Sequence, residues 1–263
     1  MNSNIADMTE MISTIEAESI LWDSPPDKVE LTHHEAHVWH ALLEPTPERV
    51  HQLSALLSVD ERDRADKFSF KLDRSRFISA RGGLRILIGR YLSKDPARLQ
   101  FWYGPYGKPF LAGVDAAKLQ FNVTHSGGRV LYAVAYGREI GVDLERINTK
   151  VSVEAIAESF FSINEVAELQ LLSGEQKYRA FFGFWARKES YVKARGDGLT
   201  AMSSRFGLSI GPTEVEPLRQ GKRSPSALAK WTMTMLDVGP EYMGALMVEG
   251  HGWLLKCWQF EMS

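Results

Sequence analysis

The sequence has a single cysteine, Cys257, so it cannot form a disulfide within the chain. Cysteine used this sparingly is typical of a reducing compartment, and we expect a cytoplasmic protein. No apolar run approaches the roughly 18–20 residues that span a bilayer. The first twenty residues contain no lysine or arginine, so they lack the positive start of a secretory signal. These absences exclude a disulfide-stabilised secreted domain and predict no association with a membrane.

The chain also lacks an excess of charge of either sign. Its 31 lysines and arginines nearly balance its 33 aspartates and glutamates, which leaves a net charge of −2. Because nucleic-acid-binding proteins usually carry a strong positive charge, we expect no nucleic-acid partner. Hydrophobic residues make up 44% of the 263 residues, enough for the core of one large domain or two small ones.

The pattern of apolar residues divides the chain into a tail and two halves. Residues 1–30 are acidic at their start, and we expect them to form a poorly ordered tail. Residues 31–138 run from strand to helices to strands, and residues 139–263 repeat this order. The segments 130–137 (VLYAVAYG) and 243–250 (MGALMVEG) end the two halves in a similar way. We therefore expect an α+β fold with an internal duplication.

Several elements follow from local patterns. Apolar residues three and four positions apart predict a helix over 77–91. Gly127-Gly128 predicts the turn of a β-hairpin. Residues 153–195 are expected to be mostly helical, with an interruption where Ser162 and Glu165 form a capping box. The segment 35–43 is expected to be a strand or a short buried segment. Strands are expected at 99–103, 120–124, 130–136, 139–144, 206–210, 231–236, 242–248 and 253–260.

The segment from Glu61 to Arg98 is basic, with eleven lysines and arginines against five aspartates and glutamates. Arg74, Arg81 and Arg85 lie on one face of the expected helix, away from its apolar stripe. This face is either an ordinary solvated helix surface or a docking surface for a polyanionic partner.

Three polar residues, Thr124, His125 and Ser126, stand where an expected strand ends in the glycine-rich turn. Hydroxyl groups, an imidazole and exposed backbone amides at one turn can bind phosphate. A polar hairpin turn without a ligand would explain the same residues.

Asp143 and Glu145 lie two positions apart on an expected strand, so their carboxylates share one face. Two such carboxylates repel each other unless a cation or a proton intervenes. Mg²⁺ is typically held by one or two carboxylates together with phosphate oxygens and water. The pair therefore predicts a magnesium site, and a solvated strand edge with Arg146 as partner is the alternative.

Glu189 lies on the apolar stripe of an expected helix, in line with Trp185 and Val192. A charge in that position must be paired, bind a metal or become protonated. An ion pair with Lys193, one turn away, would explain Glu189. It would not explain the neighbouring Lys188.

Other reactive residues do not form a motif. Four histidines occur close together, but their spacing is not that of a zinc-protease helix. They are His33, His34, His37 and His40. Cys257 lies in an apolar strand with no histidine nearby, so we expect it to pack in the core. The sequence contains no Walker loop, no G-x-G-x-x-G motif and no G-x-S-x-G elbow.

Taken in order, these segments resemble the 4′-phosphopantetheinyl transferases of the surfactin-synthetase-activating type. The resemblance covers most of the chain from about Ser58 to Ile210. It rests on Gly107-Lys108-Pro109, on the segments 121–127 (FNVTHSG) and 141–145 (GVDLE), on Phe160-Phe161-Ser162 with Glu165, and on Trp185-x-x-Lys188-Glu189-x-x-x-Lys193-Ala194. Two positions depart from the family pattern. Thr124 stands where serine is usual, and Glu61 stands where some members carry a lysine that contacts the cofactor.

The resemblance implies a pseudo-dimeric fold, with coenzyme A and Mg²⁺, or Mn²⁺ in its place, in the cleft between two similar α+β halves. It implies transfer of the phosphopantetheine arm of coenzyme A to a serine hydroxyl of an apo carrier protein, with release of adenosine 3′,5′-bisphosphate. The acceptor would be an acyl carrier protein or a polyketide or peptidyl carrier domain. Because such carriers are small and acidic, the basic segment would speed their encounter. An internally duplicated chain is expected to be a monomer.

The resemblance also implies roles for single residues. Asp143, Glu145 and Glu189 would hold the metal, and either Glu189 or a water on the metal would take the serine proton. Lys188 and Lys193 would neutralise phosphates, with Lys193 at the departing one. The phosphates of coenzyme A would be bound by Lys108, Thr124 and His125, and its adenosine 3′-phosphate by Arg62, Arg64 and Arg76.

Two other functions use the same residues. One is a Mg²⁺-dependent phosphohydrolase that acts on coenzyme A or a related pyrophosphate, with water as the acceptor. The other is a non-catalytic module that binds coenzyme A or a carrier protein and does not depend on Asp143.

Overall fold

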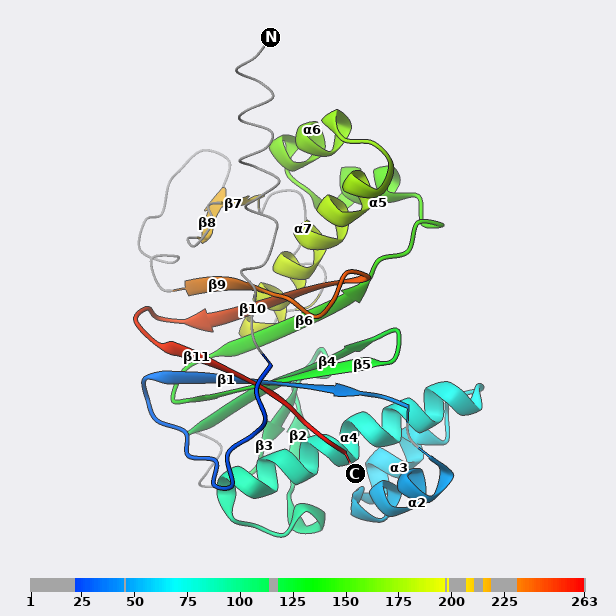
Figure 1. Ribbon diagram of the computed structural model, residues 1–263, viewed down its shortest axis with the longest axis vertical. Helices are drawn as coiled ribbons and strands as arrows, with labels where there is room; N and C mark the ends of the chain where they lie inside the picture. Colours follow the sequence, from blue (N-terminus) through cyan, green and yellow to red (C-terminus); the bar gives the residue numbers. More distant parts are fainter. Residues whose placement is uncertain are drawn as a thin grey trace. The chain divides into compact units, whose positions relative to one another are not determined.

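The structure, a computed structural model, describes residues 22–44, 46–113, 118–196, 198 and 231–262, and the backbone of two strands at 207–210 and 215–218. The chain forms two compact units. We call them the N-terminal unit (residues 21–137 with 254–263) and the C-terminal unit (residues 138–253). Figure 1 shows the elements of each. Both units contain helices and a β-sheet, so the expected α+β class is confirmed.

The N-terminal unit is built on a four-stranded sheet in the order β11-β1-β5-β4. Its strands are β1 (Glu35–Leu42), β4 (Leu119–Ser126), β5 (Arg129–Tyr136) and β11 (Leu254–Gln259). β4 and β5 form the hairpin that the sequence predicts. Its turn glycines, Gly127 and Gly128, have φ angles of 57° and 102°, which glycine adopts without strain. The hairpin places the polar residues at the end of β4 on an edge strand of the sheet.

Three helices follow in this unit, and the two shorter ones pack on the longest, which lies on the sheet. They are α2 (Pro47–Leu56), α3 (Val59–Ala65) and α4 (Lys71–Leu92), followed by a turn of 3₁₀ helix at Pro96–Arg98 and a small hairpin of β2 (Phe101–Tyr103) and β3 (Pro109–Leu111). α4 contains the helix predicted over 77–91. Its stripe residues Leu84 and Leu87 are fully buried in one apolar cluster with Trp39 and Tyr132 of the sheet. Burial of this stripe holds α4 on the sheet.

The C-terminal unit is built on a three-stranded antiparallel sheet in the order β6-β10-β9. Its strands are β6 (Ile140–Arg146), β9 (Trp231–Leu236) and β10 (Tyr242–Glu249), and β7 (Gly207–Ile210) pairs separately with β8 (Val215–Leu218). Its helices are α5 (Val153–Phe160), α6 (Ile163–Leu171) and α7 (Gly174–Arg195). The capping box between α5 and α6 is confirmed, because the N–H of Ser162 donates to Oε2 of Glu165 at 2.7 Å and the N–H of Glu165 donates back to Oγ of Ser162 at 3.3 Å.

The helix α7 forms the core of this unit with the sheet. Phe184 and Ala186 of α7 are buried in one apolar cluster with Met235 of β9 and Ala245 of β10. Within the residues that the structure describes, no helix is long and apolar enough to cross a bilayer.

The two ends of the chain depart from the expected division. We expected residues 139–263 to form one half, but β11 pairs in parallel with β1 and completes the sheet of the N-terminal unit. The ring of Trp258 lies 4.8 Å from that of Trp39, so apolar packing explains why the last strand joins this sheet. Residues 1–21 of the expected tail lie outside the described residues. Asp23, which we also placed in the tail, makes backbone hydrogen bonds with Cys257 and Gln259 of β11.

Candidate functional site

Close packing of α7 on β6 brings the motif residues of the C-terminal unit together. A Cβ atom on Gly141 would lie 2.1 Å from the carbonyl oxygen of Ser190 and 2.3 Å from the backbone nitrogen of Ala194. No larger residue fits this contact, because atoms in a packed interior do not approach so closely. Residues at even spacing on a strand point the same way, so Asp143 and Glu145 also face α7.

Asp143 is paired with Lys193 of α7. The Nζ of Lys193 donates to Oδ1 of Asp143 at 2.5 Å. Asp143 is only 2% exposed, whereas the side chain of Lys193 is 30% exposed. Burial alone would lower the pKa of Lys193, but the carboxylates of Asp143, Glu189 and Glu145 together raise it above its ordinary value. Lys193 is therefore protonated and positively charged beside three carboxylates.

The pKa values of Glu145 and Glu189 both lie above that of an ordinary exposed glutamate. Burial, strengthened by repulsion from Asp143 and Glu189, raises the pKa of Glu145 to about 7. The charge of Lys193 and a hydrogen bond from the indole N–H of Trp185 partly offset this rise. Burial also raises the pKa of Glu189, and Asp143 adds to it. The three carboxylates thus repel one another electrostatically, as like charges close together do.

The structure therefore brings Asp143, Glu145 and Glu189 from β6 and α7 within electrostatic reach, as the sequence predicts. They do not form a ready-made ligand set. In the described part of the chain, no group of three or more His, Cys, Asp or Glu is arranged to hold a metal ion as it stands. The contact with Lys193 occupies one of the two carboxylate oxygens of Asp143, Oδ1.

Lys188, which we expected to bind phosphate, lies in a buried ion pair. Its Nζ is 2.9 Å from Oε2 of Glu165, and the two side chains are 3% and 4% exposed. The same ammonium lies 5.5 Å from the ring centre of Phe161. This pair links α6 to α7 and so gives Lys188 a structural role. The sequence alone did not indicate Glu165 as its partner.

In the N-terminal unit, a guanidinium group lies against the turn between β4 and β5. A Cβ atom on Gly128 would be 3.1 Å from Nη2 of Arg76. At the end of β4, Thr124 is buried and His125 is exposed. Lys108, which precedes β3, is buried. Arg76 therefore adds a positive charge to the turn that the sequence predicts as a phosphate site.

The other two predicted phosphate ligands, Arg62 and Arg64, lie on α3 and are exposed. Arg62 donates a hydrogen bond to the carbonyl oxygen of Leu57. The guanidinium of Arg64 lies 5.5 Å from the ring centre of Phe77. A guanidinium group has five N–H donors, so these contacts leave both residues able to bind an anion.

Glu61 is at the centre of a buried ion cluster that the sequence analysis missed. Its Oε2 accepts a hydrogen bond from Nε of Arg85 at 2.6 Å, and its Oε1 lies 3.4 Å from Nε of Arg81. Arg85 is 1% exposed and Arg81 is 7% exposed. Both of our alternatives, a solvated face and a docking surface, are therefore wrong for these two residues. Arg74 is exposed and pairs with Asp66.

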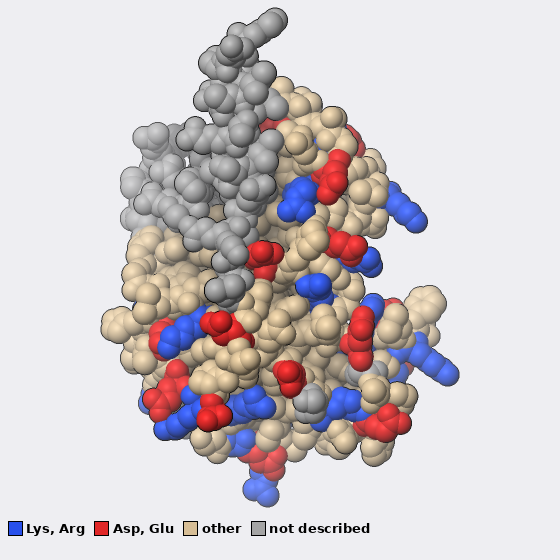
Figure 2. Space-filling view, in the orientation of Figure 1, with Lys and Arg blue, Asp and Glu red and all other residues tan. Residues whose placement is uncertain are grey.

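These ion pairs neutralise part of the charge of the segment from Glu61 to Arg98. Arg98 adds a further pair with Asp95. Figure 2 shows acidic and basic side chains intermixed on the face in view. Because the acidic partners belong to the segment, these pairs leave its excess of basic residues unchanged. The burial of Arg81 and Arg85 is what reduces the positive charge at its surface.

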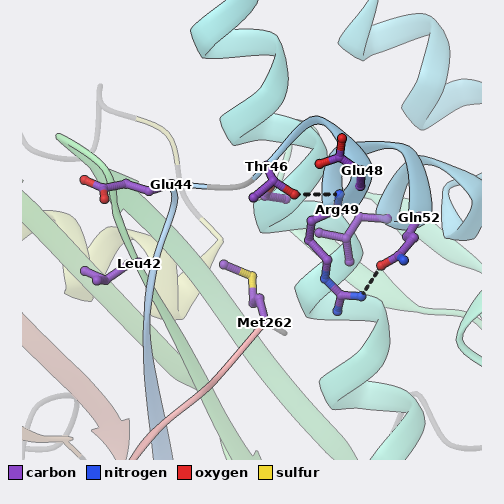
Figure 3. Close-up of a pocket in the computed structure, with 9 residues that line it drawn as sticks. Leu42, Glu44, Thr46, Glu48, Arg49, Gln52 and Met262 are labelled. Carbon is purple, nitrogen blue, oxygen red and sulfur yellow. Dashed lines mark hydrogen bonds between the residues drawn. The ribbon is translucent and has the colours of Figure 1, made fainter.

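A cavity of about 390 Å³ opens elsewhere in the N-terminal unit, between the end of β1, the start of α2 and Met262 (Figure 3). Arg49 lines it and donates to Oε1 of Gln52 at 2.9 Å. None of the predicted site residues lines this cavity.

The chain matches known proteins over most of its length. It is 35% identical to the 4′-phosphopantetheinyl transferase HetI of Nostoc sp. over 240 residues, which are 91% of this chain and 98% of that protein. A profile of the 4′-phosphopantetheinyl transferase superfamily matches residues 139–244, and a profile of the 4′-phosphopantetheinyl transferase N-terminal region matches residues 41–136. The chain belongs to the 4′-phosphopantetheinyl transferase superfamily.

Other transferases of this superfamily match a shorter part. The chain is 31% identical to a phosphopantetheinyl transferase of Thraustochytrium sp. over 159 residues, 56% of this chain and 55% of that protein. It is 30% identical to the 4′-phosphopantetheinyl transferase Sfp of Bacillus subtilis over 156 residues, 59% of this chain and 67% of that protein. Both regions of the two-domain type are present in order, so the predicted family and its activity, 4′-phosphopantetheinyl transfer to carrier proteins, are confirmed.

Proposed function

We propose that this transferase takes the phosphopantetheine arm from coenzyme A, with Mg²⁺ as its metal ion. The acceptor is a serine hydroxyl of an apo acyl carrier protein or of a polyketide or peptidyl carrier domain. The proposal depends on one observation, the grouping of Asp143, Glu145 and Glu189 around Lys193 in the C-terminal unit. The family resemblance also implies two similar halves with coenzyme A bound between them, and we keep this arrangement as part of the proposal.

The donor atoms of this group suit a divalent cation, although the three side chains are not arranged as a ligand set as they stand. All three acidic side chains offer oxygen ligands, the kind that Mg²⁺ prefers, and Mn²⁺ accepts the same ligands. Three ionised carboxylates beside one ammonium leave two negative charges uncompensated. Burial raises the pKa of Glu145, and repulsion from Asp143 and Glu189 adds to this rise. When bound, a divalent cation supplies the charge that holds a pyrophosphate against carboxylates.

The residues of the chain then serve the transfer step. The serine oxygen attacks the phosphorus that carries the pantetheine arm, and the bond from this phosphorus to the bridging oxygen breaks. Negative charge develops on the departing bisphosphate, and Lys193 neutralises it. Glu189, the carboxylate of this group on α7, takes the serine proton. The products are the holo carrier protein and adenosine 3′,5′-bisphosphate.

The N-terminal unit binds the remainder of coenzyme A. Arg76 supports this assignment, because its guanidinium lies against the polar turn. Lys108, Thr124 and His125 bind phosphate oxygens, and Arg62 and Arg64 join Arg76 at the adenosine 3′-phosphate. Lys188 is left out of this set, since its ammonium is held by Glu165 in a buried pair.

Intact mass spectrometry of a carrier protein tests the proposal. An apo carrier protein incubated with coenzyme A, Mg²⁺ and this transferase should gain the mass of one phosphopantetheine arm. Adenosine 3′,5′-bisphosphate should appear in equal amount. The Asp143→Ala variant should fold normally and leave the carrier unmodified. Breakdown of coenzyme A without a carrier would point to a phosphohydrolase, and unchanged reactants would point to a binding module.

A further inference from the structure

The ammonium of Lys193 lies beside the three carboxylates that would bind the divalent cation. Its ammonium donates to Oδ1 of Asp143 at 2.5 Å, and it lies one helical turn beyond Glu189 on α7. Its charge also interacts with those of Glu189 and Glu145. An ammonium group and a divalent cation seek the same surroundings, namely several carboxylate oxygens.

We propose that Lys193 and the divalent cation compete for the carboxylates of this group, so that the cation displaces the ammonium from Asp143. The inference rests on the proposed function, in which these carboxylates bind Mg²⁺. Mg²⁺ binds a carboxylate oxygen at about 2.0–2.1 Å. Asp143 is 2% exposed, so little water screens its surroundings. Two positive charges near one buried carboxylate repel each other, so each weakens the binding of the other.

Once displaced from Asp143, the ammonium of Lys193 is able to contact the substrate. Its side chain is 30% exposed, so the ammonium can turn toward solvent while its backbone stays on α7. There it can meet the phosphate whose departure it assists. Lys193 thus compensates the carboxylates until the cation arrives, and arrival of the cation releases it for the substrate.

The competition is measured as the affinity of the full chain for Mn²⁺ alone, by isothermal titration calorimetry at the same pH for every variant. Lys193→Met removes the competing charge and should bind Mn²⁺ about fivefold more tightly than the wild type. Lys177→Met is the matched control, because Lys177 lies on the same helix and pairs with Glu154 at 2.7 Å. Its affinity for Mn²⁺ should not change.

The outcomes separate this inference from the proposed function. Equal or weaker binding of Mn²⁺ by Lys193→Met would overturn the competition and leave the metal site in place. Absence of Mn²⁺ binding by the wild type would overturn the metal site, and the competition with it.

A second measurement on the unaltered protein covers the case in which Lys193→Met does not fold. Labelling of lysines with an amine-reactive reagent, read by peptide mass spectrometry, reports how accessible each ammonium is. Mg²⁺ should speed the labelling of Lys193 several-fold relative to EDTA and leave Lys177 unchanged. Equal labelling of Lys193 under both conditions would overturn the proposal.

Discussion

The Nε atom of Arg85 lies 2.6 Å from Oε2 of Glu61, and both side chains are 1% exposed. Arg85 also donates to the carbonyl oxygens of Pro96 and Leu99, each at 3.0 Å. The pair therefore joins α3, α4 and the turn that leads to β2. Although Glu61 stands where some family members carry a cofactor-binding lysine, here it holds the N-terminal unit together.

Replacing Glu61 by alanine should therefore destabilise the protein. Removal of one partner of a buried ion pair typically costs about 3–5 kcal/mol, because the other charge stays buried and uncompensated. Asp66→Ala is the control, since its pair with Arg74 is exposed and such pairs contribute about 1 kcal/mol or less. Urea denaturation measures both variants. A loss for Glu61→Ala no larger than that for Asp66→Ala would contradict the structural role.

Gly141→Ala should disrupt the packing of α7 on β6. The added Cβ would lie 2.1 Å from a backbone oxygen of α7, and backbone cannot move aside as a flexible side chain can. We expect a loss of about 3 kcal/mol or more, at the upper end for overpacking. Gly104→Ala is the control, because its Cβ would lie 3.1 Å from the Phe110 ring and 3.8 Å from the nearest backbone atom. Thermal melts that agree within error for the two variants would refute the close contact.

Local patterns in the sequence account for most of the fold. The glycine turn and alternating strands predict the β4–β5 hairpin, and apolar spacing predicts α4. The pairing of β11 with β1 could not be predicted, because it joins strands from opposite ends of the chain. Nothing local in an apolar strand such as β11 indicates which sheet it completes.

In the candidate site, too, local patterns predict some features, and contacts between distant elements determine the rest. Asp143 and Glu145 share a face because of their spacing, and the order of the family motifs places Glu189 with them. The partners of Lys188 and Arg85 depend on contacts between distant elements, and so they were missed. One signal was available: Arg81 and Arg85 lie one turn apart on a helix that is buried on most sides, so they required an internal carboxylate.

His40 gives the N-terminal unit a dependence on pH. Burial, with a smaller effect of Arg129, lowers its pKa from 6.5 to about 4. The unfolded chain thus takes up a proton near pH 6.5 and the folded chain only near pH 4, so stability falls as the pH falls through this window. Between about pH 7 and about pH 5, this group should cost roughly 2 kcal/mol.

Glu145 acts in the opposite direction, because its raised pKa makes the folded state gain stability as the pH falls through about 7. The test therefore compares the wild type with His40→Gln at the two pH values. The change in unfolding free energy between them should be about 2 kcal/mol smaller in the variant. An identical pH dependence in both proteins would contradict a buried, neutral His40.

Lys193→Ala should slow transfer far more than it weakens binding of coenzyme A. A group that stabilises charge in the transition state contributes about 10²–10³-fold to the rate. We therefore expect kcat to fall by about 10²-fold or more, with a change in the Kd of coenzyme A of less than about tenfold. Steady-state kinetics and calorimetry give the two values. Equal losses in both would mean that Lys193 only binds the substrate.

The central claim is that Asp143 of β6 and Glu189 of α7 serve a single metal-dependent centre. The rate of carrier-protein modification in Asp143→Asn, in Glu189→Gln and in the variant with both changes tests it most directly. If both residues serve one centre, the double variant should be about as slow as the slower single variant, since either change already disables it. A double variant whose rate falls by the product of the two single losses would show independent roles and contradict the account.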